Sequence, residues 1–141
     1  MLNSIYKLLR QFGYPHPIHP TEVHMPIGLI VGALIFRIAA VLLRRPVLGQ
    51  TAHYCTILAA IFLFPTVLFG YMDWQHFYDG DWLFPIKVKL VLAVILIMLV
   101  LNSVFLVHKK STGSGWVLLN YTASFVVVVA LGYFGGNLVY G

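Results

Sequence analysis

Four stretches of about twenty apolar residues constrain the fold of this chain more than any other feature. They run from about 23 to 43, 51 to 72, 85 to 107 and 115 to 139. A helix rises about 1.5 Å per residue, so each stretch can cross a hydrocarbon core of about 30 Å. Strands in an open sheet would leave backbone groups unpaired in lipid. The sequence therefore predicts an all-α integral membrane protein, a four-helix bundle with short connections.

The composition agrees with a membrane protein and excludes several other classes. Apolar residues make up 60% of the chain and charged residues 9%, whereas a soluble domain is nearer half apolar and a quarter charged. This excludes an ordinary cytosolic domain, a disordered tail and a nucleic-acid-binding module. We expect the lipid bilayer as a partner, and no nucleic acid. The single cysteine, Cys55, rules out an internal disulfide and a covalently attached c-type haem.

The first 14 residues form a separate predicted unit. Apolar residues recur there at helical spacing, with Lys7 and Arg10 between them, which is typical of an amphipathic helix too short to span a bilayer. Prolines at 15, 17 and 20 then forbid a regular helix. We expect an interfacial amphipathic helix over residues 1–14 and a four-transmembrane-helix domain over residues 15–141.

Pairs of basic residues at the ends of two spans predict the orientation. Arg44 and Arg45 follow the first span, and Lys109 and Lys110 follow the third, on the same side. The other side also carries four basic residues, together with all four acids, so the total counts do not decide. Because tight juxtamembrane pairs favour the cytoplasm, we expect both termini outside. Arg37, within the first span, is expected to reach the cytoplasmic interface by snorkelling.

Polar and aromatic residues gather at the predicted outer end of the bundle, and every span contributes to the set. Its members are His16, His19, Glu22, His24, Tyr71, Asp73, Trp74, His76, Lys87, Lys89 and Asn137. Polar side chains at membrane depth are costly and usually serve a function. The alternative is a purely structural role, since polar and aromatic residues are common in the headgroup region.

One face of the first span carries a histidine followed by two glycines. His24, Gly28 and Gly32 are spaced four residues apart and so share that face. An imidazole followed by bare backbone suits a porphyrin that lies against the helix. Gly28 and Gly32 also form a G-x-x-x-G motif, typical of close helix packing, which Gly132 and Gly136 repeat in the fourth span. Both interpretations stay open.

Three short motifs carry a resemblance to a known family. Residues 19–29 read HPTEVHMPIGL, residues 70–74 read GYMDW, and residues 135–140 read GGNLVY. In this order they resemble a family of small bacterial four-helix membrane proteins catalogued as domain of unknown function 2231 (DUF2231). The resemblance covers residues 19–141 and implies a multi-pass protein of the bacterial cytoplasmic (inner) membrane. It also implies a redox setting beside c-type cytochromes, with haem b or a quinone as cofactor.

The chain departs from the family pattern at two places. The family usually has a histidine early in the third helix, where this chain has Lys87 and Lys89. It also continues past the final tyrosine into His-Gly, whereas Gly141 follows Tyr140 directly here. If the missing histidines are ligands in the family, this chain is a structural member that lacks them.

Two functions follow from these observations. The first is a subunit of an electron-transfer complex that holds haem b or a quinone near the outer face. Its site residues would be His24 as axial ligand, His19 or His76 as the second ligand, Gly28 and Gly32 beneath the ring, and Tyr71 and Asp73 to relay protons or orient an imidazole. The second is a non-catalytic accessory or scaffold subunit of a larger membrane complex. Both are favoured over a stand-alone enzyme.

Overall fold

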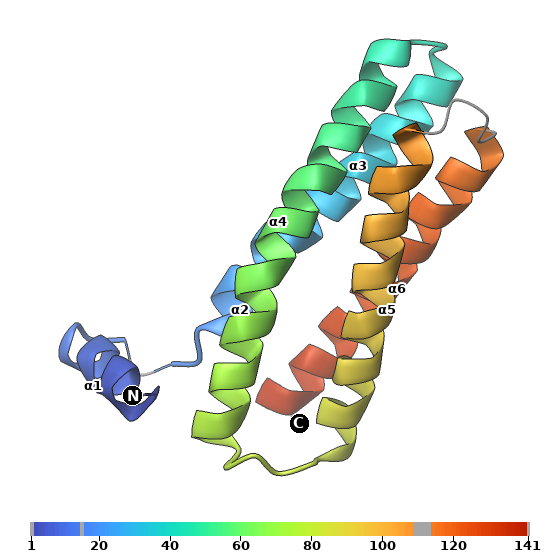
Figure 1. Ribbon diagram of the computed structural model, residues 1–141. Coiled ribbons are helices and arrows are strands. Elements are labelled where there is room, and N and C mark those ends of the chain that lie inside the picture. The colour runs from blue at the N-terminus through green and yellow to red at the C-terminus, as the bar shows by residue number, and fades with distance from the viewer. Residues whose placement is uncertain (1, 15, 109–113, 141) are drawn as a thin grey trace.

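A computed structural model describes residues 2–14, 16–108 and 114–140, and it is helical almost throughout this range (Figure 1). The helices are α1 (Leu2–Gln11), α2 (His19–Glu22), α3 (His24–Leu42), α4 (Pro46–Phe77), α5 (Phe84–His108) and α6 (Ser114–Tyr140). Four segments are long and apolar enough to cross a membrane: His19–Leu42, Pro46–Phe77, Phe84–Phe105 and Gly115–Leu138. The prediction of an all-α membrane bundle is confirmed. Lys109, Lys110 and Gly141, which the sequence analysis singled out, lie outside the described residues.

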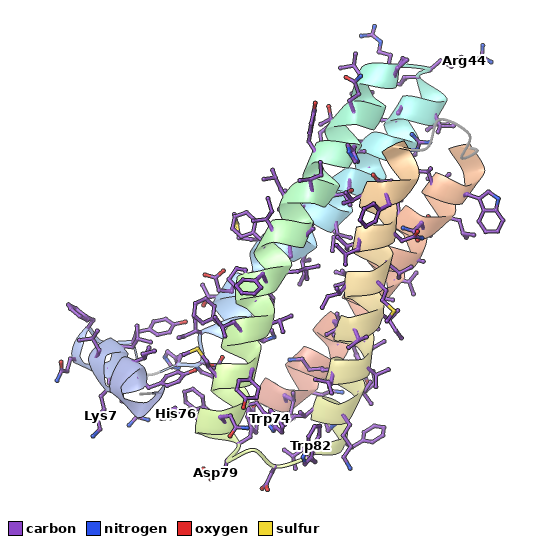
Figure 2. All side chains as sticks on the ribbon, viewed as in Figure 1. Lys7, Arg44, Trp74, His76, Asp79 and Trp82 are labelled. Atoms are coloured by element: carbon purple, nitrogen blue, oxygen red, sulfur yellow. The ribbon has the colours of Figure 1, made fainter. Side chains whose placement is uncertain are left out.

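The four long helices form two antiparallel hairpins, α3 with α4 and α5 with α6, which pack against each other (Figure 1). The short amphipathic helix α1 lies beside the lower half of α4 and is joined to the bundle through α2. Figure 2 shows Trp74, His76 and Trp82 at this end and Arg44 at the opposite end. We call these the Asp73 end and the Arg37 end.

Small and branched apolar residues fill the centre of the bundle. One buried cluster joins all four long helices through Ile30, Ala59, Leu63, Leu96, Val100 and Val128. Fully buried alanines, such as Ala52 and Ala59, let α4 approach its neighbours closely. Large apolar side chains also cover the outside, and Phe64 is 77% exposed. An apolar surface around an apolar core is what lipid, rather than water, stabilises.

A few buried polar side chains cross-link the helices. Asn120 of α6 donates to the backbone carbonyl of Leu99 at 2.9 Å and to the hydroxyl of Ser103, both on α5. At the next residue of α6, the hydroxyls of Tyr121 and Thr56 lie 3.0 Å apart and join α6 to α4. In lipid such bonds between helices add to packing, at roughly 1 kcal/mol each.

Helix α4 is longer than the predicted span of 51–72. It begins at Pro46, whose fixed φ and missing N–H suit the first position of a helix. It continues through Pro65 and ends at Phe77, where Asp79 and Gly80 take left-handed φ values of 48° and 75°. The indole of Trp74 donates to the Asp81 carbonyl at 2.9 Å and holds this turn against the helix end. Because α4 continues past residue 72, Asp73 and His76 are held on a regular helix at this end of the bundle.

Candidate functional site

The carboxylate of Asp73 is the centre of a hydrogen-bond network at the Asp73 end. It is 5% exposed and lies near the end of α4. It accepts hydrogen bonds from the backbone N–H of His19 at 2.7 Å, from that of Ile18 at 3.2 Å, and from the hydroxyl of Tyr6. The two N–H groups belong to the start of α2, where a helix has no internal acceptors for its first amides. Asp73 supplies that acceptor from another helix.

The ring of His19 packs tightly against α4. Its Nδ1 lies 2.9 Å from the backbone carbonyl of Thr66, and because a carbonyl can only accept, Nδ1 carries the proton. A Cβ atom at Gly70 would lie 3.0 Å from this nitrogen and 3.1 Å from Cε1. A side chain at position 70 would press on the imidazole, so Gly70 lets the ring lie close against α4.

Tyr6 fixes α1 to the end of α4. Its ring stacks on that of His76, with 4.0 Å between centroids and 1° between planes, and meets the ring of Phe77 edge-on at 5.4 Å. Only 3% of the residue is exposed. Burial, followed by the hydrogen bond and the charge of Asp73, raises the pKa of the Tyr6 phenol. The phenol therefore stays protonated and remains a donor to the carboxylate.

Lys89 brings a positive charge toward the same network from α5. Its side chain is half-buried, and Nζ lies 3.7 Å from the position of a Cβ on Gly135 of α6. The ammonium group interacts favourably with the charge of Asp73. The charge at this end is thus partly balanced within the chain.

The structure brings together some of the predicted site residues and leaves others apart. His19, Asp73 and His76 belong to one network, which Tyr6 completes. The side chains of His24 and Tyr71 are exposed, and Tyr71 meets Trp74 edge-on at 5.9 Å.

The two glycines of the first span have different surroundings. Gly28 has no atom within 4 Å of a built Cβ, whereas Gly32 faces Cys55 Sγ of α4 at 4.0 Å. Gly32 thus takes part in packing within the bundle, while Gly28 lies on the open side of α3.

Sequence reasoning missed the roles of Tyr6, Thr66 and Gly70. Tyr6 could have been noticed as a residue with a polar tip on the apolar face of the amphipathic helix. Gly70 opens the G-x-x-D-W motif, but the motif alone does not say which ring lies against it. The Thr66 contribution is a backbone carbonyl, which leaves no signal in the sequence.

The donor set allows a test of whether these residues fit a haem or a metal ion. Among the described residues, no three side chains of His, Cys, Asp or Glu form a group that could hold a metal ion. A b-type haem needs one or two imidazole nitrogens aimed at its iron. His24, with open space over Gly28, fits a ring on the outside of α3 and not one enclosed by the bundle. Its ligand role, with His19 or His76, stays a prediction.

Comparison with known proteins places this chain in a family. A family model described as a predicted membrane protein, DUF2231, matches residues 15–141. The chain therefore belongs to this family. No curated protein and no solved structure matches it.

Proposed function

We propose that this protein is a non-catalytic accessory subunit that supports a larger membrane complex. The observation that carries the proposal is that the Asp73 carboxylate is hydrogen-bonded within the chain. Its buried carboxylate is engaged by the chain's own donors, two backbone amides and one phenol. A carboxylate used in this way locks helices together, and breaking the lock would leave a buried charge without donors, which is strongly destabilising. The hydrogen bonds at the Asp73 end then hold α1 and α2 on α4.

A face of α6 supports the proposed attachment to a partner helix. Gly132 and Gly136 lie one turn apart, and neither has an atom within 4 Å of a built Cβ. Small residues in this spacing let two helix backbones approach closely in lipid. Since the bundle does not use this space, the partner helix would come from another polypeptide.

The experiment compares two substitutions on α6 in native membranes solubilised in mild detergent. Gly132→Ile fills the open face, whereas Val126→Ile adds bulk at an exposed position on a different face of the same helix. We expect native gel electrophoresis to show a complex larger than the 15.9 kDa chain, containing a second polypeptide identified by mass spectrometry. Gly132→Ile should release the chain and Val126→Ile should not. A chain that runs alone in every case contradicts the proposal.

A redox function is the second candidate, and the open side of α3 favours it. The exposed His24 and the bare backbone of Gly28 follow one another along this side. A b-type haem held there by His24 would lie between this chain and a partner such as a c-type cytochrome, and would supply one-electron chemistry. A quinone could instead accept a hydrogen bond from Lys89.

Spectroscopy and extraction test this second candidate. Protein purified from its native membrane should show a Soret band that His24→Ala abolishes, while His16→Ala, at another exposed histidine, leaves it unchanged. Solvent extraction would recover the quinone, if that is the cofactor. Native protein with neither a Soret band nor a bound quinone rules the redox role out.

We also propose that the protein resides in the bacterial cytoplasmic membrane with both termini outside. The basic pair Arg44 and Arg45, at the turn between α3 and α4, supports this orientation. A C-terminal alkaline phosphatase fusion should be active and a green fluorescent protein fusion dark. The reverse pattern would invert the topology.

A further inference from the structure

A cavity between α3 and α4 lies at the Arg37 end, far along the bundle from the Asp73 network. Its volume is about 580 Å³, and it is open to the outside of the bundle. Arg37 of α3 and Gln50, His53 and Tyr54 of α4 provide its polar lining, while Ala40 and Val41 form part of an apolar wall. A lining that combines polar and apolar side chains suits an amphipathic ligand.

The depth of the cavity matches the headgroup region of a bilayer. Arg37 lies five residues before the end of α3, and His53 lies seven residues after the start of α4. At 1.5 Å per residue these positions are about 8 and 10 Å from the turn between the helices. The side chain of Arg37 turns toward α4, where Nη1 lies 3.4 Å from a Cβ position on Gly49. The absence of a side chain at Gly49 makes room for the guanidinium group.

Charge at this end is positive. Arg37 lines the cavity, and Arg44 and Arg45 form the adjacent turn. The first turn of α4, which begins at Pro46 on the cavity wall, adds the positive end of a 32-residue helix dipole. All four acids of the chain lie in α2, in the last two turns of α4 or in the turn that follows it, toward the opposite end. The field at the cavity therefore favours an anion.

We propose that this cavity binds the phosphate group of an anionic phospholipid. The planar guanidinium of Arg37 is suited to a bidentate contact with phosphate, and the polar side chains of His53 and Gln50 line the same cavity. The acyl chains would follow the exposed apolar side of α4, which includes Val47 and Leu58. Basic pockets between transmembrane helices are known to hold anionic headgroups. This site is independent of the proposed accessory or redox function.

Lipid retention by the full chain in detergent tests the proposal. Native mass spectrometry would count bound phosphatidylglycerol and phosphatidylcholine over a range of lipid concentrations. We expect the wild type to prefer phosphatidylglycerol, and Arg37→Gln to weaken its apparent affinity about tenfold, as for loss of one charge-assisted hydrogen bond. Gln50→Glu, at an exposed position, places a negative charge in the cavity with little change of volume. Gln50→Glu should weaken binding to a similar extent. It keeps the proposal testable if Arg37→Gln fails to fold.

Arg45→Gln is the matched control because it removes one charge at the same end but outside the cavity lining. It should change the affinity less than about threefold, as expected for an exposed charge. Equal losses of affinity in Arg37→Gln and Arg45→Gln would overturn the proposal, because they would show that the lipid responds to general surface charge and not to the cavity. Absence of a preference for phosphatidylglycerol would overturn it too. Displacement of the lipid by millimolar inorganic phosphate would overturn the assignment to a lipid and make free phosphate the ligand.

Discussion

The two ends of the bundle use similar polar residues to opposite effect. At the Asp73 end, a buried carboxylate receives its donors from α1 and α2, so the polar groups satisfy one another within the chain. At the Arg37 end, a guanidinium and an imidazole line a cavity of about 580 Å³ that is open to the outside. The comparison teaches that the chain's own N-terminal segments cover the polar residues at one end, whereas polar residues at the other end line a space that a ligand can reach.

Chain connectivity explains the difference. Before α3 begins, residues 2–14 and 16–22 lie beside α4 near its end and bring Tyr6 and two backbone amides to it. At the other end α3 passes to α4 through a tight turn, in which Arg44 has a left-handed φ of 51°. This turn places Arg37 and His53 on neighbouring helices, where both line the cavity.

Removal of the Asp73 carboxylate is expected to have the largest effect on stability. Asp73→Ala leaves three donors without their acceptor, and hydrogen bonds to a charged group contribute about 1.5–3 kcal/mol each. We expect a loss of at least about 3 kcal/mol and release of α1. Thermal unfolding in detergent and limited proteolysis of the first 14 residues would measure both. Asp81→Ala, at an exposed position, is the control because its hydrogen bonds are made by its backbone N–H and carbonyl, which alanine keeps, and equal melting of the two variants would refute the lock.

The Gly70→Ala substitution should have the next largest effect. A methyl group there meets the His19 ring at about 3.0 Å, so the ring or the helix must move, at a cost of about 1–3 kcal/mol. Gly115→Ala makes the same change in α6, where a Cβ meets nothing within 4 Å. It should be neutral or stabilising, because alanine favours helix. Similar melting temperatures for both variants would show that the ring is not confined.

Tyr6→Phe should cost about 1–2 kcal/mol, since the ring still stacks on His76 while the donor to Asp73 is lost. Tyr133→Phe, at an exposed tyrosine, is the control.

The effect of Tyr6→Phe should depend on pH in one direction. Because the pKa of Tyr6 is raised in the folded chain, the stability it contributes is fully present below the unfolded value near 10 and declines as pH rises above it. Unfolding measured between pH 8 and 11 would show this as a shrinking difference between wild type and Tyr6→Phe. A difference that grows with pH would be inconsistent with a buried protonated phenol.

The smallest effect on the protein alone is expected at the Arg37 end. Gln50→Glu changes an exposed side chain, so its melting temperature without lipid should stay within a degree or two of wild type, about 0.5 kcal/mol. Phosphatidylglycerol should then raise the melting temperature of wild type more than that of the variant, because a ligand that binds the folded state stabilises it. The same rise in both proteins would place the lipid elsewhere.

The sequence by itself determined the four spans, the amphipathic first helix and the gathering of polar residues at one end. These follow from hydrophobic length and helical period, which are local properties of the chain. It also pointed to His19, Asp73 and His76. The tertiary structure decided that Tyr6 and Gly70 complete their network, that His24 is exposed, and that Arg37 lines a cavity. The physical reason is that the rotation of each helix about its axis depends on side chains distant in sequence, which no local pattern records.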